Sequence, residues 1–157
     1  MNPLRVVLHA HSTWSYDGAW ELPWIARLYG ALGVDAVMMS EHDTGFDPAC
    51  FPEYRAACAA ASTLSCTLVP GIEYSSPDND IHILTWGLAD FLAEHRPVAE
   101  TLGEVKARGG VAVFAHPIRR DAWRLCDPAW VPQLAGSERW NRKSDGIAPS
   151  REAWDLI

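Results

Sequence analysis

The chain has 157 residues, of which 48% are hydrophobic and 21% are charged. This composition excludes intrinsic disorder, and the length allows one sizeable hydrophobic core, so we expect residues 1–157 to form a single domain. The 13 basic and 20 acidic residues give a net charge of −7, which disfavours binding to nucleic acid over a broad surface without excluding it.

The sequence contains no export signal and no apolar stretch long enough to span a membrane. Its cysteines form no Cys-x-x-Cys pair and lie mostly in apolar surroundings, which favours free thiols over disulfides or a zinc knuckle. The cysteines are Cys50, Cys58, Cys66 and Cys126. We therefore expect a cytoplasmic protein that does not bind membranes.

Strand-like and helix-like segments alternate along the chain, which predicts an α/β fold. Pro70 lacks an N–H group, so regular strand pairing is not expected at that residue. In chain order we expect a strand over Leu4–Ala10, a helix over Leu22–Leu32 closed by Gly33, a strand over Asp35–Ser40, a helix over Pro52–Ser62, strands over Thr67–Tyr74 and Ile81–Trp86, a helix over Val98–Arg108 and a strand over Val111–Ala115.

Two histidines separated by one residue end the first predicted strand. Side chains alternate along an extended strand, so His9 and His11 point to the same side and can bind one metal ion together. Asp17 follows in a Ser-Tyr-Asp-Gly turn that can bring its carboxylate back over the strand end. Taken alone, this segment fits an exposed histidine pair beside an ordinary turn equally well.

Polar residues of the same kinds accompany the later strands. Glu41–Asp43, Glu73 and His116 each lie at or just after the carboxyl end of a predicted strand. Active sites of parallel α/β proteins are found at the carboxyl ends of the strands, so these side chains should converge in space. His82 lies early in its strand and fits this rule least well, and His95 looks like a surface loop residue.

Each of these residues also has a structural explanation, such as a solvated loop or a hydrogen-bonded histidine. Together they form a set of nitrogen and carboxylate ligands suited to zinc, manganese or iron. The candidate metal ligands are His9, His11, Asp17, His42, Glu73, His82 and His116.

Several short motifs occur in an order that is specific as a set, although each one is weak alone. They are His9-Ala10-His11-Ser12 with Asp17-Gly18, Ser40-Glu41-His42-Asp43-Thr44, Gly71-Ile72-Glu73, His82-Ile83-Leu84, Ala115-His116-Pro117 and the Glu-x-x-Asn segment within Gly136–Asn141. Over Leu4–Asn141 the chain thereby resembles the PHP (polymerase and histidinol phosphatase) family of metallohydrolases.

The resemblance implies a distorted (β/α)7 barrel that holds two or three divalent metal ions and hydrolyses phosphate esters through a metal-activated water. It assigns His9 and His11 to one ion, with Glu73 bridging to a second ion at His82 and His116. Asp17 and His42 would contribute to a third ion. The resemblance further implies that Asp17, His42 and Glu73 take part directly in catalysis.

Two arginines follow the last of the candidate histidines. Arg119 and Arg120 can neutralise the phosphate of a substrate, although a solvated turn explains them equally well. The expected partner is a small phosphorylated metabolite or nucleotide.

The sequence departs from the family pattern at two points. Glu41 replaces the usual Asp of the second motif, and its extra methylene group is expected to alter the orientation of His42. A late Asp-x-His motif is missing before Ile157, and Ala153–Ile157 reads as a helix cut off in mid-course. We therefore expect a PHP-type barrel that is incomplete and truncated at its C-terminal end.

Two functions follow from these observations. The first is a metal-dependent phosphoric ester hydrolase. The alternative is a degenerate or truncated PHP module that binds metal or a protein partner without turnover. A barrel edge exposed by truncation would also allow a homo-oligomer.

Overall fold

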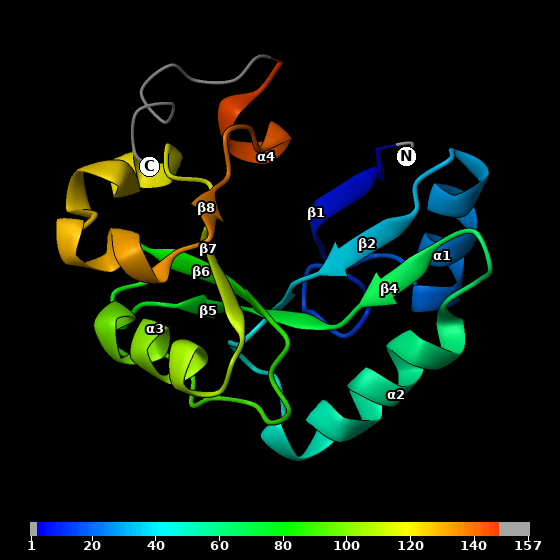
Figure 1. The fold of residues 1–157 in the computed structure, drawn as a ribbon, viewed down its shortest axis with the longest axis horizontal. Helices are drawn as coiled ribbons and strands as arrows, with labels where there is room; N and C mark the ends of the chain where they lie inside the picture. The colour runs from blue at the N-terminus through cyan, green and yellow to red at the C-terminus, as the bar shows by residue number, and fades with distance from the viewer. Residues whose placement is uncertain (1–2, 148–157) are drawn as a thin grey trace.

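The computed structural model describes residues 3–147, which form two β-sheets with helices packed on them (Figure 1). One sheet has the strand order β1 (Val6–Ala10), β2 (Ala36–Met39) and β4 (Thr67–Val69), and all of its pairs are parallel. The other has the order β3 (Glu41–His42), β5 (Gly71–Ser75), β6 (His82–Trp86), β7 (Val111–Phe114) and β8 (Gly136–Ser137).

Within residues 3–147, four α-helices accompany the sheets: α1 (Leu22–Ala31), α2 (Phe51–Ala61), α3 (Val98–Ala107) and α4 (Arg142–Asp145). Short 3-10 helices cover Pro48–Cys50, Arg119–Leu125 and Pro128–Gln133. The bounds of the first three helices lie within one residue of those expected. The helix expected at Ala153–Ile157 lies outside the described residues.

The α/β prediction is confirmed, but the described strands form no closed barrel. The chain passes from one sheet to the other at Ser40, between β2 and β3, and at Pro70, between β4 and β5. The sequence predicts one strand over Thr67–Tyr74 and none at Glu41–His42, so the break at Pro70 and the strand β3 both differ from the prediction. Pro70 has no N–H to donate to a ladder, so the strand pairing breaks there and the chain can change sheets.

Strand β6 runs opposite to its neighbours, contrary to the expected parallel arrangement. It pairs antiparallel with both β5 and β7, whereas β3 and β5 are parallel, as are β7 and β8. The connection from β5 to β6 covers only residues 76–81. A parallel return needs a crossover of about a dozen residues or more, so this short turn forces the chain to reverse direction.

The hydrophobic core lies between the sheets and their helices. Helices α1 and α2 contact each other and β4, and α3 packs on β7 (Figure 1). Tyr54 of α2, Leu102 of α3 and Phe114 of β7 are fully buried. No helix in residues 3–147 combines the length and apolar character needed to cross a membrane.

Candidate metal centre

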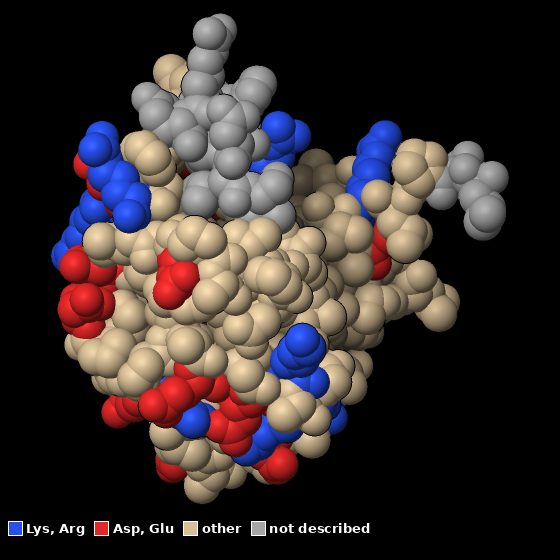
Figure 2. Space-filling view, turned by 60° about the vertical axis from the view of Figure 1, so that its left-hand side comes forward, with Lys and Arg blue, Asp and Glu red and all other residues tan. Residues whose placement is uncertain are grey.

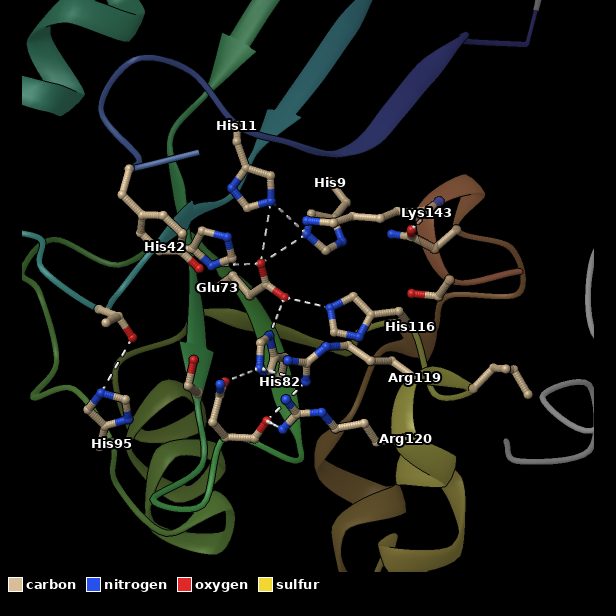
Figure 3. A pocket seen from close by; sticks show the side chains of 17 residues that line it. His9, His11, His42, Glu73, His82, His95, His116, Arg119, Arg120 and Lys143 are labelled. Atoms are coloured by element: carbon tan, nitrogen blue, oxygen red, sulfur yellow. Dashed lines mark hydrogen bonds and ion pairs between the residues drawn. The ribbon is translucent and has the colours of Figure 1, made fainter. Parts of the chain in front are cut away.

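A single carboxylate, that of Glu73 on β5, lies at the centre of a group of histidines (Figure 3). Its side chain is buried, and its two oxygens face different imidazole rings. Oε2 lies 3.1 Å from His9 Nε2, 3.4 Å from His11 Nε2 and 3.2 Å from His42 Nδ1. Oε1 lies 2.6 Å from His82 Nδ1 and 2.7 Å from His116 Nε2.

His9 and His11 come from the first sheet and reach Glu73 by an irregular path. The pairing of β1 with β2 shifts register between Leu8 and Ala10, and His9 has a φ of 72°. A bulge of this kind re-aims a side chain. The Nε2 atoms of His9 and His11 lie 3.0 Å apart, so the two rings do meet, but through the bulge rather than through regular strand alternation.

The reversal of β6 explains the position of His82. His82 begins β6 and pairs with Ser75, the last residue of β5. Since β6 is antiparallel, its amino end lies beside the carboxyl ends of β5 and β7. His82 therefore points to the same edge of the sheet as His116, which follows β7 with a φ of 24°.

The donor atoms form overlapping groups around Glu73. The donors of His9, Glu73 and His116 lie within 4.8 Å of one another, as do those of His11, His42 and Glu73. The Nε2 atoms of His9 and His11, which the resemblance assigns to one ion, also lie 3.0 Å apart and within 3.4 Å of Glu73 Oε2.

Asp17 stands at the edge of this cluster and belongs to neither group. Its Oδ1 lies 3.4 Å from His42 Nε2, and its Oδ2 lies 3.5 Å from the exposed Nζ of Lys143 on α4. Burial raises the pKa of Asp17, but the charges of His42 and His11 outweigh this effect and lower the pKa below its usual value. Asp17 is therefore a carboxylate at neutral pH.

Electrostatics within the cluster favour an ionised Glu73. Burial acts to raise the pKa of Glu73, but hydrogen bonds from His116, His82 and His9 hold it well below its usual range. For His9, burial acts to lower the pKa, and hydrogen bonds to Glu138 and Glu73 overcome it and raise the pKa to about 10. Burial lowers the pKa of His11 to about 4, so it stays neutral beside a charged His9.

Glu138, just after β8, is a member of the site that the sequence analysis did not assign. Its buried carboxylate lies 3.0 Å from His9 Nδ1 and accepts a 2.6 Å hydrogen bond from the backbone N–H of His116. Glu138 thus orients the ring of His9 and fixes the backbone at His116, and both histidines are candidate ligands. The Glu-x-x-Asn motif contained this residue, but no sequence feature linked it to His9.

Glu41 acts on a loop rather than on the His42 ring. Its buried carboxylate accepts hydrogen bonds from the backbone N–H and hydroxyl of Ser12 and from the hydroxyl of Ser15. Ser15 Oγ in turn accepts a 2.9 Å bond from the backbone N–H of His42. Glu41 therefore ties the loop after β1 to β3, and reaches His42 only through Ser15.

The cluster opens into a cavity of about 720 Å³. Arg119, Arg120 and Lys143 line one side of this cavity, so the structure brings the two predicted substrate-binding arginines to the candidate centre (Figure 3). His95 also lines it, with Nε2 3.4 Å from Thr44 Oγ1. His95 is an exposed loop residue, as predicted, and its backbone N–H donates to Asp43 just after β3, which places it beside the cavity.

The chemistry of the donor set fits divalent metal ions. Imidazole nitrogens and a carboxylate are borderline donors suited to zinc, manganese or iron. If the site held no metal, all five imidazole rings would serve only as hydrogen-bond partners of Glu73. One carboxylate does not need that many partners. His9, His11, His42, Glu73 and His116 could hold ions in the two groups, with His82 beside Glu73 as a further donor.

Basic and acidic side chains lie near one another on part of the surface. On the face drawn in Figure 2, the Lys and Arg side chains that are visible are interspersed with Asp and Glu. Glu104 of α3 forms ion pairs with both Arg96 and Arg108.

Comparisons with known proteins identify the fold. No protein-family model and no curated protein matches the sequence. Among solved structures, a candidate metal-dependent phosphoesterase from Bifidobacterium adolescentis is 16% identical, with a TM-score of 0.68 over 99% of this chain and 83% of that chain.

Two further solved structures are similar. A two-domain protein from Bacteroides vulgatus, containing a predicted PHP-like metal-dependent phosphoesterase, is 19% identical with a TM-score of 0.61 over 85% of this chain and 43% of that one. An amidohydrolase from Chromobacterium violaceum, with bound sulfate and no metal, is 16% identical with a TM-score of 0.58 over 85% and 76% of the two chains. The resemblance to PHP-like proteins is thus confirmed at the level of the fold.

Proposed function

We propose that this chain, which shares the fold of PHP-like metal-dependent phosphoesterases, is itself a metal-dependent hydrolase of small phosphate esters. The observation that carries the proposal is the position of Glu73. Its two oxygens face two different sets of imidazoles, which is the arrangement needed for a carboxylate that bridges two ions.

Bound divalent ions would polarise the phosphoryl group, activate water at neutral pH and stabilise the leaving oxygen. The protein's own contribution is to hold the ligands and the ester. Glu73 would bridge the ions, with His9, His11 and His42 facing its Oε2 and with His82 and His116 facing its Oε1. The ionised Asp17 would add a carboxylate on the solvent side of His42.

Arg119 and Arg120 support a phosphate ester as the substrate. Their guanidinium groups line the same cavity as the histidines, and guanidinium geometry suits phosphate oxygens. Arg120 also lies 3.3 Å from Asp80 at an exposed position. The cavity volume suits a phosphorylated metabolite or nucleotide rather than a polymer.

Two competing functions are separated by experiment. The similarity to an amidohydrolase makes a carboxamide the competing substrate class, and the same donors would serve its hydrolysis. The other alternative is a module that binds metal without turnover. The arginines favour the phosphate ester because they match an anionic substrate and have no evident partner in a neutral amide.

The test compares Glu73→Gln with Glu53→Gln, which makes the same chemical change at an exposed position on α2. Each purified protein is loaded with Zn²⁺, Mn²⁺ or Fe²⁺ and assayed with p-nitrophenyl phosphate, bis-p-nitrophenyl phosphate and a p-nitroanilide. Bound metal is measured by elemental analysis. We expect the wild type and Glu53→Gln to bind two ions and cleave a phosphate ester, and Glu73→Gln to lose both properties.

The outcomes that oppose the proposal are distinct. Metal-dependent cleavage of the anilide alone would assign the chain to amide hydrolysis. Uptake of metal with no turnover of any substrate would favour the binding module. Phosphatase activity that survives Glu73→Gln unchanged would remove the proposed centre altogether.

A further inference from the structure

The turn between β5 and β6 carries a residue that no motif singled out, Asn79. Its side-chain Oδ1 lies 2.7 Å from Nε2 of His82, three residues along the chain. We propose that Asn79 is a positioning residue that selects the tautomer of His82 in which Nδ1 is free to bind a metal ion. This inference rests on the proposed metal centre.

Both ring nitrogens of His82 have defined neighbours. Nδ1 lies 2.6 Å from Glu73 Oε1, on the side where an ion would be held, and Nε2 faces Asn79. An amide oxygen can only accept a hydrogen bond, so the Asn79 contact requires the proton of a neutral His82 to be on Nε2. An ion that replaces the Nδ1 proton donated to Glu73 then meets the lone pair of Nδ1, as a ligand must present it.

A second neighbour of Nε2 favours the opposite tautomer. Nη1 of Arg119 lies 3.3 Å from His82 Nε2, and a guanidinium can only donate. If Nε2 accepted that bond, the proton of the neutral ring would move to Nδ1 and face Glu73. Asn79 opposes this in two ways, because its side-chain oxygen accepts a hydrogen bond from Nε2–H and its backbone oxygen accepts a 3.0 Å bond from Arg119 Nη1.

Other residues hold the turn itself, so the role of the Asn79 side chain can be tested separately from the shape of the turn. Asp78 Oδ1 accepts bonds from the Ser76 hydroxyl at 2.5 Å and from the Asp80 N–H at 3.2 Å, and Ser76 Oγ accepts one from the Ile81 N–H at 3.0 Å. These bonds hold Asn79 at a φ of 59°. Asn, Asp and Gly adopt this left-handed conformation more readily than other residues.

The backbone therefore dictates which substitutions are informative. Asn79→Gly keeps the left-handed position and removes the acceptor. Asn79→Asp keeps an acceptor oxygen at the same place. Asp78→Ala is the matched control, because it weakens the turn without removing a contact to His82.

The experiment measures zinc affinity of the full chain by competition with a chromophoric chelator, together with the His82 tautomer in the zinc-loaded protein by long-range ¹H–¹⁵N NMR. We expect Asn79→Gly to weaken zinc binding about 10- to 100-fold and to populate the Nδ1–H form. Asn79→Asp and Asp78→Ala should keep both the affinity and the Nε2–H form.

A double variant tests the competition with Arg119 directly. In the Asn79→Gly background, Arg119→Met removes the donor that favours the wrong tautomer, so part of the lost zinc affinity should return. A residue that only shaped the turn would show no such recovery.

Three results would overturn the inference. They are an unchanged affinity and tautomer in Asn79→Gly, an equal loss in Asp78→Ala, and no recovery in the double variant. Each leaves the proposed function standing if the wild type binds zinc. A wild type that takes up no zinc would instead overturn the metal centre and this inference together.

Discussion

At the scale of single residues, the orientation of each imidazole depends on a partner behind it. Glu138 shows this most directly, because one oxygen faces His9 Nδ1 and the other accepts from the backbone N–H of His116. With the Nδ1 proton of His9 held by Glu138, an ion that displaced the Nε2 proton would meet the lone pair of Nε2 beside Glu73. Partners of this kind set the tautomer of metal-binding histidines.

Glu138→Gln is expected to weaken zinc binding about 10- to 100-fold while keeping the fold. The glutamine has one oxygen for two contacts, and if that oxygen serves the His116 N–H, its NH₂ group faces His9 Nδ1. His9 would then carry its proton on Nε2, toward Glu73. Chelator competition measures the loss, and Glu104→Gln, a carboxylate with two arginine partners on α3, should bind zinc as the wild type does.

At the scale of secondary-structure elements, the site depends on the close approach of β5 and β6. Gly71 begins β5 and pairs with Trp86 at the end of β6. A Cβ at position 71 would lie 2.2 Å from Trp86 Cδ1 and 2.4 Å from the backbone oxygen of Thr85. Trp86 cannot easily move, because it is buried and its Nε1 donates a 2.7 Å bond to the Met39 oxygen in the other sheet.

Gly71→Ala should therefore lower the free energy of unfolding by about 1–3 kcal/mol or more, as overpacking does. The control is Gly103→Ala on α3, where a Cβ meets nothing within 4 Å and helix propensity predicts a gain of about 0.5–1 kcal/mol. Urea unfolding measures both. Equal stability of Gly71→Ala and the wild type would show that the two strands are less tightly packed than described.

Cys58 on α2 is expected to make the free energy of unfolding depend on pH in the alkaline range. Burial raises the pKa of this thiol from 9.0 to about 12, although a hydrogen bond to Tyr54 lowers it in part. Between these values the unfolded chain has released the thiol proton and the native protein has not. The native state then binds more protons than the unfolded state, so the free energy of unfolding falls as pH rises through this range.

The contribution of one such thiol approaches about 1.4 kcal/mol per pH unit. Cys58→Ala should make unfolding less pH-dependent between pH 9 and 11, even though the smaller side chain lowers the stability at every pH. Urea titrations at pH 8, 9, 10 and 11 compare the two slopes. Identical slopes would mean that Cys58 ionises equally in both states.

At the scale of the whole molecule, the candidate centre lies where the two sheets meet. His9 and His11 belong to β1 and the loop after it, in or beside the first sheet, whereas Glu73, His82 and His116 are in or just after strands of the second. Ions held jointly by the histidines of the first sheet and by the ligands of the second would link the two sheets. The unfolded chain does not hold these residues together, so binding of the proposed ions would be coupled to folding.

Zinc at a free concentration of about one hundred times its dissociation constant should therefore stabilise the protein by about 2.7 kcal/mol. Calorimetry with zinc and with EDTA measures the change in melting temperature. Glu73→Gln should melt at the same temperature in both solutions. A wild-type melting temperature that is indifferent to zinc would contradict a centre that joins the sheets.

The sequence predicted α1, α2, α3 and most strands to within one or two residues, but not α4. It also predicted the candidate ligands that lie around Glu73. The element bounds and the candidate ligands could be predicted because each depends on a short segment of the sequence. Periodicity and turn residues belong to short segments, and the histidine and acidic motifs each occupy a few consecutive positions. The sequence by itself thus determined which residues carry metal-binding chemistry and which elements present them.

The tertiary structure decided how those residues meet. The reversal of β6 brings His82 to the same edge as His116, the chain changes sheet at Ser40 and Pro70, and Glu138 reaches His9 across 129 positions of the chain. Pro70 and the short turn before β6 favour two of these features locally. The contacts between distant residues arise only when the whole chain packs around one core.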